Sequence, residues 1–288
     1  MGIKSFDVLG NISVVNFPRD FKKKDKKKFA EKILKENSSI KTVLEKTGKV
    51  KGRLRKPSIK YLAGEKTKEV LYKENNCVFR FNTDKTYFSP RLSNERKEIA
   101  SKIKKGEKVL VMFAGVAPFS IVIAKNSKAE KVFSNEINRE ANKYGRLNAE
   151  LNKVKNKIVF VDGDIKRVVK KWSSVPPSIS PTTRPNSTAH LHSQFSLTDL
   201  RNFSKFDVII MPRPQLKETF LEQAFYLSKK KTRIYYYDFC KIGDENLIVD
   251  KIKKEAQKFK KKIKILKIKK AGEIAPYKIR VRVDFVVL

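Results

Sequence analysis

The chain has 288 residues, of which 40% are hydrophobic, enough for one large domain or for a catalytic domain with a smaller companion. Its 67 Lys and Arg residues outnumber 30 Asp and Glu residues, so the formal net charge is +37. Two cysteines exclude a disulfide framework, two histidines disfavour a zinc site, and no apolar run reaches the roughly 18 residues of a membrane span. We expect a cytoplasmic protein that binds no metal and no membrane.

Residues 1–90 combine short strand-like runs with one helix. The runs at 12–15 and 78–81 are typical of β-strands, and apolar side chains recur at helical spacing over 26–35. This pattern predicts a small α+β domain over residues 1–90, which we expect to bind RNA or substrate.

From residue 108 the pattern changes to strands and helices in alternation. Such alternation is typical of a doubly wound parallel sheet, so we expect residues 91–288 to form an α/β domain. A lysine-rich run at 258–270 alternates Lys with Ile and Leu, which predicts a strand with one solvated face. The other expected strands cover 109–112, 131–134, 158–161, 208–211 and 233–237, with helices from Pro118 and over 138–152.

Residues 172–204 interrupt this composition. The segment contains eight Ser, four Thr and four Pro, and neither Lys nor Glu, in a chain otherwise rich in lysine. It has too little apolar surface to order itself, so we predict a disordered insertion. His190 and His192 lie within it, and an isolated pair of this kind does not indicate a metal site.

The excess of positive charge concerns the partner of the protein and not its fold. A nucleic acid fits, because each Lys or Arg that neutralises a phosphate releases condensed counterions. The alternative is the lysine-rich surface of a heat-adapted protein, but that predicts balanced charge. Acidic residues are here outnumbered by more than two to one, which favours nucleic-acid binding.

The segment from Val109 to Ser120 reads as a strand, a glycine turn and a helix, which lets backbone N–H groups approach a ligand closely. Glu136 follows the second strand, where a carboxylate binds ribose hydroxyls. Asp164 follows the third strand, where an acid meets an adenine amino group. This pattern is typical of S-adenosylmethionine methyltransferases. A dinucleotide-binding domain is the weaker alternative, because the turn lacks the G-x-G-x-x-G spacing.

These motifs resemble those of the archaeal and eukaryotic tRNA (guanine-37-N1) methyltransferases. The blocks YFSPRLSNER at 87–96 and MFAGVAPFSI at 112–121 carry the resemblance. It covers nearly the whole chain apart from the serine-rich insertion. Further matching segments lie at 7–11, 50–55, 138–141, 151–154, 163–164, 275–277 and 282–285.

The resemblance implies a class I methyltransferase fold with a small N-terminal α+β domain, S-adenosyl-L-methionine as cofactor and a tRNA anticodon loop as partner. It implies an enzyme that forms 1-methylguanosine at tRNA position 37, and we expect this enzyme to be a monomer. Some archaeal relatives methylate C7 of the tricyclic base 4-demethylwyosine at the same position, and this reaction stays open as an alternative. A basic RNA-binding protein with an empty cofactor site is the non-enzymatic alternative.

Guanine N1 must lose a proton as it attacks the methyl group, so a carboxylate is needed as general base. The resemblance assigns this role to Glu95, which could instead be a surface partner of Arg96 or Lys97. Negative charge grows on guanine O6, and a fixed cation stabilises it. We choose Arg55 for that cation and Arg53 second, although either could contact an RNA phosphate.

The remaining predicted site residues also follow from the resemblance. Arg96 is expected at the cofactor carboxylate, whereas Phe113 could contact adenosine or belong to the core. At Pro212 the family usually has Asn, so one polar contact to the base is in doubt. The predicted cofactor site consists of Arg96, Phe113, Gly115, Glu136, Ile137, Asp164 and Ile165, and the predicted substrate site of Arg53, Arg91 and Pro212.

Overall fold

The computed structural model describes residues 6–18, 20–48, 52, 54, 58–173, 205–212 and 218–288. The predicted insertion at 172–204 falls almost entirely outside these residues, as do Arg53 and Arg55. Within the described ranges, no helix combines the length and the apolar character that a membrane span requires.

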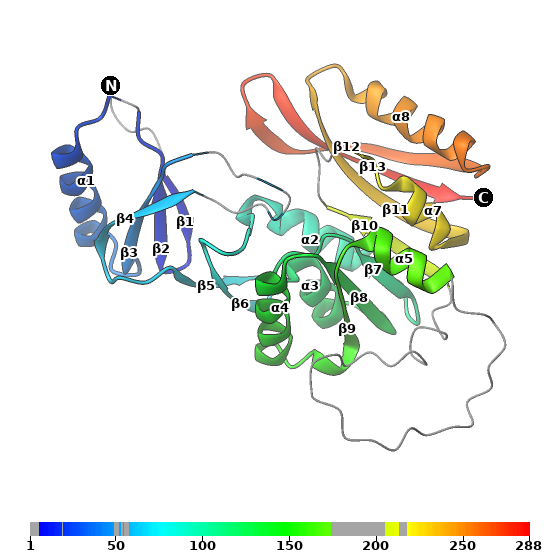
Figure 1. Ribbon diagram of the computed structural model, residues 1–288, viewed down its shortest axis with the longest axis horizontal. Coiled ribbons are helices and arrows are strands. Elements are labelled where there is room, and N and C mark those ends of the chain that lie inside the picture. The colour runs from blue at the N-terminus through cyan, green and yellow to red at the C-terminus, as the bar shows by residue number, and fades with distance from the viewer. Residues whose placement is uncertain are drawn as a thin grey trace.

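The N-terminal part is a four-stranded sheet with one helix packed on it (Figure 1). Helix α1 (Lys23–Glu36) buries Ala30 and Ile33 against the sheet, as its helical apolar spacing predicts. The strands lie in the order β1-β2-β3-β4 and comprise β1 (Phe6–Leu9), β2 (Ile12–Val15), β3 (Thr42–Lys46) and β4 (Ile59–Gly64).

A separate hairpin of β5 (Glu69–Glu74) and β6 (Cys77–Asn82) packs against the larger domain. Backbone N–H groups of β6 donate to two asparagine side chains of α4 (Arg139–Leu151) and its C-cap: Val78 donates to the C-cap Asn152 over 2.9 Å, and Arg80 donates to Asn148 over 2.7 Å. The apolar side of the hairpin joins the core beneath α4. We therefore propose a domain boundary near residue 68 in place of the one predicted after residue 90.

The larger domain is built on a seven-stranded sheet in the order β12-β13-β11-β10-β7-β8-β9. Among its described strands only β13 runs against the others, a departure from the predicted parallel sheet. The turn between β12 and β13 is too short for a crossover, so the two strands must pair antiparallel. The strands are β7 (Lys108–Val111), β8 (Lys131–Glu136), β9 (Ile158–Asp162), β10 (Phe206–Met211), β11 (Ser228–Lys241), β12 (Ile263–Ala275) and β13 (Lys278–Val287).

Helices cover both faces of this sheet, as the predicted alternation requires (Figure 1). On β7, Val109 and Val111 belong to one core and Leu110 to the other, because successive side chains of a strand point to opposite faces. The first core includes α2 (Ser93–Ser101), α3 (Pro118–Asn126) and α4, and the second includes α5 (Ile165–Ser173), α7 (Leu221–Tyr226) and α8 (Glu245–Lys258). Short 3-10 turns lie at Pro90–Leu92 and Lys155–Lys157.

Candidate active site

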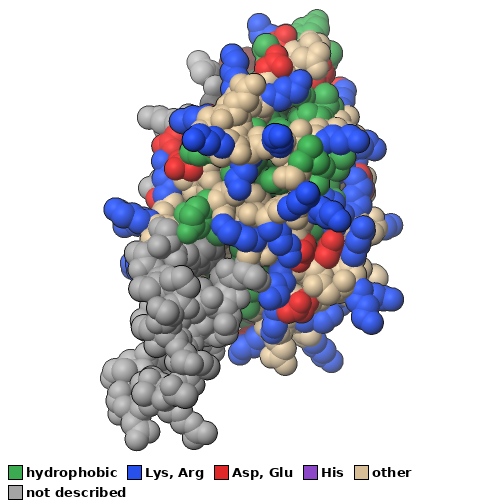
Figure 2. All heavy atoms as spheres, turned by 90° about the vertical axis from the view of Figure 1, so that its right-hand side faces the viewer, with side chains coloured by type: hydrophobic (Ala, Val, Ile, Leu, Met, Phe, Trp, Pro, Cys, Tyr) green, Lys and Arg blue, Asp and Glu red, His purple; other side chains and the backbone are tan. Residues whose placement is uncertain are grey.

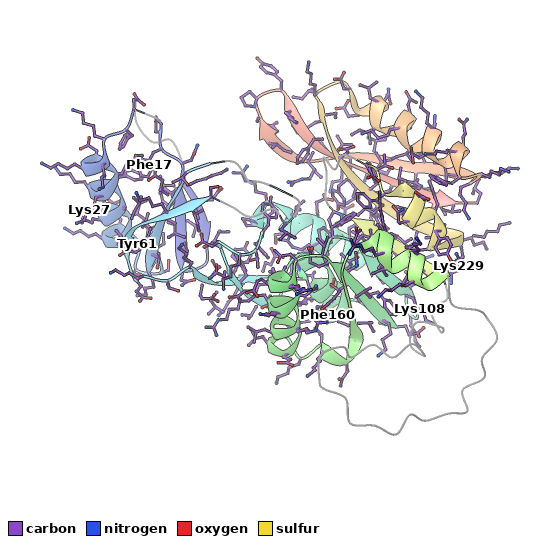
Figure 3. The ribbon with its side chains drawn as sticks, in the orientation of Figure 1. Phe17, Lys27, Tyr61, Lys108, Phe160 and Lys229 are labelled. Carbon is purple, nitrogen blue, oxygen red and sulfur yellow. The ribbon has the colours of Figure 1, made fainter. Side chains whose placement is uncertain are left out.

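The carboxyl ends of β7, β8, β9 and β10 meet at one edge of the sheet, where open α/β sheets bind their ligands. The opposite edge holds a structural cluster, in which Asp207 accepts from the Lys108 backbone and pairs with Lys229 over 2.6 Å (Figure 3). The predicted cofactor residues after β7, β8 and β9 therefore share the ligand edge.

The loop after β7 has an unusual backbone. Phe113, Gly115 and Ala117 have φ of 57°, 61° and 65°, so left-handed residues alternate with others along the loop. In the two non-glycine residues this conformation costs of order 1–3 kcal/mol each, and such strain gathers at functional sites. Two hydrogen bonds hold the loop to the end of β8, from Ala114 N to Asn135 O over 2.8 Å and from Gly115 N to Glu136 over 2.8 Å.

Glu136 ends β8 and is 8% exposed. Its Oε2 accepts from Gly115 N and its Oε1 from Asn138 N, each over 2.8 Å. Within the described ranges no Lys or Arg forms an ion pair with it. A carboxylate held by neutral backbone donors keeps lone pairs for further donors. The remaining lone pairs can accept from the two hydroxyls of a ribose, which is the role predicted for Glu136.

The loop after β9 places Asp164 beside this carboxylate. Gly163 donates from its backbone to Glu136 O over 2.8 Å, and the Asn135 side chain donates to Gly163 O over 3.0 Å. Asp164 accepts from Lys166 N over 3.1 Å and so caps α5, at the position where the sequence predicts a contact to an adenine amino group.

The other predicted cofactor residues differ in exposure. Ile137 follows Glu136 and is half-buried, whereas Ile165 is 2% exposed and packs in the core against the sheet. Phe113 packs edge-on against Phe220, with ring centroids 5.1 Å apart, and stays half-buried. Both readings of Phe113, as core residue and as adenosine contact, remain open.

Arg96 does not lie free at the ligand edge. It is 1% exposed, its Nε and Nη2 pair with both oxygens of Glu74, and Nη2 also donates to Ser89 O over 3.0 Å. Its guanidinium stacks over Phe88. Arg96 forms a buried ion pair with Glu74 of the hairpin, and we therefore propose that it stabilises the hairpin and does not bind the cofactor.

Glu95 lies one residue earlier, in the first turn of α2, and is 4% exposed. Its Oε2 accepts from Tyr237 Oη over 2.9 Å and from Arg282 Nη1 over 2.6 Å, and its Oε1 pairs with Lys269 Nζ over 2.7 Å. Glu95 is thus no exposed partner of Arg96 or Lys97. Its carboxylate is held by side chains of β11, β12 and β13.

Glu98, one helical turn later, shares two of these cations. Arg282 Nη2 donates to it over 2.7 Å, and Lys269 also pairs with it. The bond from Arg282 is the main reason why the pKa of Glu98 lies far below its usual range. Burial opposes the charge of Lys269, but its bonds to Glu95 and Glu98 outweigh burial and raise its pKa. Glu98 and Lys269 are therefore both charged at neutral pH.

Strand register places Glu95 at the ligand edge. Met211, the last residue of β10, pairs with Tyr236 of β11, so Tyr237 and its partner Glu95 lie just beyond the end of β10. In the first turn of α3, directly after the strained loop, Phe119 packs edge-on against Tyr237 with ring centroids 6.1 Å apart. Pro212, directly after β10, is half-buried at the same edge.

Of the other predicted substrate residues, the structure describes only Arg91. Arg91 is exposed and pairs with Asp7 of β1 over 3.0 Å, which links it to the small domain. Arg53 and Arg55 lie outside the described residues, so their roles stay predictions.

Sequence reasoning missed Tyr237, Lys269 and Arg282 as neighbours of Glu95. One signal was present in the last strand, where Arg280, Arg282 and Asp284 alternate with apolar residues. Charges at every second position of an otherwise apolar strand put a charged row on one face. Arg282 is fully buried, and a buried arginine is almost always paired with an acidic side chain.

The sheet order with its one reversed strand, and the acids after β8 and β9, define an S-adenosylmethionine-dependent methyltransferase of class I. A model described as the TRM5/TYW2 methyltransferase domain matches residues 70–175, and one described as the TYW2 N-terminal domain matches residues 3–67. The two matches meet beside the domain boundary proposed from the packing of the hairpin.

Named relatives extend this match over the whole chain. The tRNA (guanine(37)-N(1))/4-demethylwyosine(37)-methyltransferase Taw22 of Nanoarchaeum equitans is 35% identical over 97% of this chain and 98% of its own length. The tRNA (guanine(37)-N(1))-methyltransferase Trm5b of Pyrococcus abyssi is 32% identical over 98% of this chain and 74% of its own length. The crystal structure of that Trm5b superposes with a TM-score of 0.78, at 32% identity over 99% of this chain and 75% of that one. The chain belongs to the TRM5/TYW2 methyltransferase family, which confirms the predicted family and fold class.

Proposed function

We propose that this protein transfers a methyl group from S-adenosyl-L-methionine to N1 of the guanosine at position 37 of tRNA. The observation that carries the proposal is Glu95, a nearly buried carboxylate at the ligand edge of a methyltransferase sheet. The names of both relatives support the choice of substrate, since each specifies N1 of guanine 37.

The cofactor supplies a methyl group bound to a sulfonium, which is electrophilic. Glu136 would bind its ribose hydroxyls and Asp164 its adenine amino group. The loop after β7 would face it with backbone groups whose left-handed conformation is already in place. These residues would bind and orient the donor.

Glu95 would act on the base. It accepts the N1 proton, so that the N1 electron pair forms the new bond to carbon while the carbon–sulfur bond breaks and its electrons stay on sulfur. Tyr237 and Arg282 both hold Oε2 and fix the carboxylate plane, so the proton would go to Oε1, which pairs with Lys269. General-base help of this kind is worth about 10²–10⁴-fold in rate.

The surface charge fits a tRNA partner. Lys and Arg side chains far outnumber acidic ones on the face that includes α8 (Figure 2), where Lys251, Lys253, Lys254 and Lys258 are exposed. Phosphate contacts release counterions, so tRNA affinity should fall steeply as salt rises. A nearly flat dependence on salt would show that the charge serves another purpose.

C7 methylation of 4-demethylwyosine is the second candidate. Two observations favour it: the relative from Nanoarchaeum equitans is named for both reactions, and Pro212 offers neither a side-chain amide nor a backbone N–H to a guanine edge. The two reactions share the donor and the position in tRNA, so the choice between them depends on the base pocket.

One experiment tests both candidates. The protein is incubated with S-adenosylmethionine and with tRNA carrying either guanosine or 4-demethylwyosine at position 37, and the nucleosides are identified by mass spectrometry. We expect 1-methylguanosine from the first tRNA. Product from the second alone would replace the proposal by its alternative. No product from either, and no heat on titration with S-adenosylhomocysteine, would indicate a non-catalytic RNA-binding protein.

A further inference from the structure

The three partners of Glu95 differ in their exposure to solvent. Tyr237 and Arg282 are fully buried, so no substrate reaches the carboxylate past them. The Lys269 side chain keeps 32% of its surface exposed, whereas that of Glu95 keeps 6%. Among these partners of Glu95, Lys269 is therefore the one that a base coming from solvent can contact.

The spacing of the two groups matches the edge of guanine. Lys269 Nζ lies 2.7 Å from Glu95 Oε1, the oxygen that Tyr237 and Arg282 leave open. In guanine the N1–H donor and the O6 acceptor sit on neighbouring ring atoms and point the same way. A carboxylate oxygen beside an ammonium offers the complementary acceptor and donor.

The charges explain why a cation is needed there. Before reaction, Lys269 and Arg282 face the carboxylates of Glu95 and Glu98. When Glu95 takes the N1 proton it becomes neutral, and the negative charge moves onto the base, largely to O6. A cation in contact with both Glu95 and guanine O6 has a negatively charged partner before and after the proton transfer. Its raised pKa, which follows from its bonds to Glu95 and Glu98 despite burial, keeps Lys269 protonated for this purpose.

We propose that Lys269 is a further catalytic residue, whose ammonium binds O6 of the target guanine in addition to the predicted Arg55, while Glu95 removes the N1 proton. This assignment rests on the proposed function. Lys102 does not qualify, because it pairs with Glu98 and Asp284 and not with Glu95. Arg282 is excluded because it is fully buried beneath Glu95.

The test uses single-turnover rates on one tRNA that carries either guanosine or 6-thioguanosine at position 37. Lys269→Gln should slow methylation of guanosine by about 10²–10³-fold, as expected when one donor to a developing oxyanion is removed. Lys269→Arg, which keeps a cationic donor, should recover most of that loss. Sulfur is a weak acceptor, so on 6-thioguanosine the same Lys269→Gln change should cost far less.

Lys270→Gln is the matched control, since Lys270 is exposed on the same strand and pairs only with Glu273 among the described residues. It should leave both rates unchanged. An equal loss of methylation rate on both bases, or no recovery of the rate in Lys269→Arg, would overturn the assignment and indicate that Lys269 only positions Glu95. A full rate in Lys269→Gln would also overturn the assignment. A wild-type protein that forms no 1-methylguanosine would instead refute the proposed function itself, together with this assignment.

Discussion

Arg282 donates from Nη1 to Oε2 of Glu95 over 2.6 Å, and this contact joins the last strand to the first turn of α2 across 187 positions of sequence. Arg282 is fully buried and Glu95 nearly so. A buried charge left without its partner costs about 3–5 kcal/mol, so the pair keeps one geometry. The proposed general base therefore meets its substrate in a fixed orientation.

Glu95→Gln should lower the single-turnover methylation rate by about 10²–10⁴-fold, because an amide keeps the shape of the side chain but cannot accept the N1 proton. Affinity for S-adenosylhomocysteine should hardly change. Glu136→Ala and Asp164→Ala should do the reverse and weaken cofactor binding by about 10–100-fold, the worth of a hydrogen bond to a charged group. Full activity in Glu95→Gln would place the base elsewhere.

Arg96→Met should lower the free energy of unfolding by about 3–5 kcal/mol, because it leaves the buried Glu74 carboxylate without its cation. Urea unfolding measures this loss. The double variant Glu74→Leu/Arg96→Met should recover part of it, since no uncompensated charge remains. Cofactor affinity of the folded variants should match that of the wild type. Weaker cofactor binding without lost stability would return Arg96 to the cofactor site.

Stability should depend on pH through Glu98 and Lys269. The pKa of Glu98 is lowered from 4.5 on folding, so its contribution is complete above that value and is lost as pH falls through the lower folded pKa. The pKa of Lys269 is raised from 10.5, so its contribution is complete below that value and is lost as pH rises through the higher folded pKa.

Urea unfolding across the pH range checks both limbs. In Glu98→Gln the loss of stability at acidic pH should become less steep. The loss at alkaline pH should remain, but it should be smaller than in the wild type. An acid limb of the same steepness in this variant would assign it to other carboxylates.

Pro212→Asn should separate two explanations for the proline. If the proline has simply replaced an asparagine, the new amide should raise guanine N1 methylation by up to about 10²–10³-fold. If the pocket is shaped for the tricyclic base, the variant should depress methylation of 4-demethylwyosine and help guanine little. We favour the second result, because proline stiffens the chain directly after β10. No change on either substrate would show that position 212 does not line the base pocket.

The sequence by itself determined the order of strands and helices and the acids that follow β8 and β9 at the ligand edge. Apolar periodicity is local, so the strands at 131–134 and 158–161 could be predicted from a few residues each, and all the predicted strands from 109 to 237 are present. In a parallel α/β sheet, residues that follow neighbouring strands must meet at one edge. Glu136 and Asp164 could therefore be placed together without coordinates.

Only the tertiary structure decided which charges pair. Arg96 was expected at the cofactor, yet Glu74 lies close enough on the folded hairpin to bind it. Glu95 gains its partners from positions 237, 269 and 282, and nothing local indicates that these three converge. The reversed strand β13 and its register on β11 bring them together. Ion pairs depend on distances of a few ångströms between distant segments, and only the folded chain sets such distances.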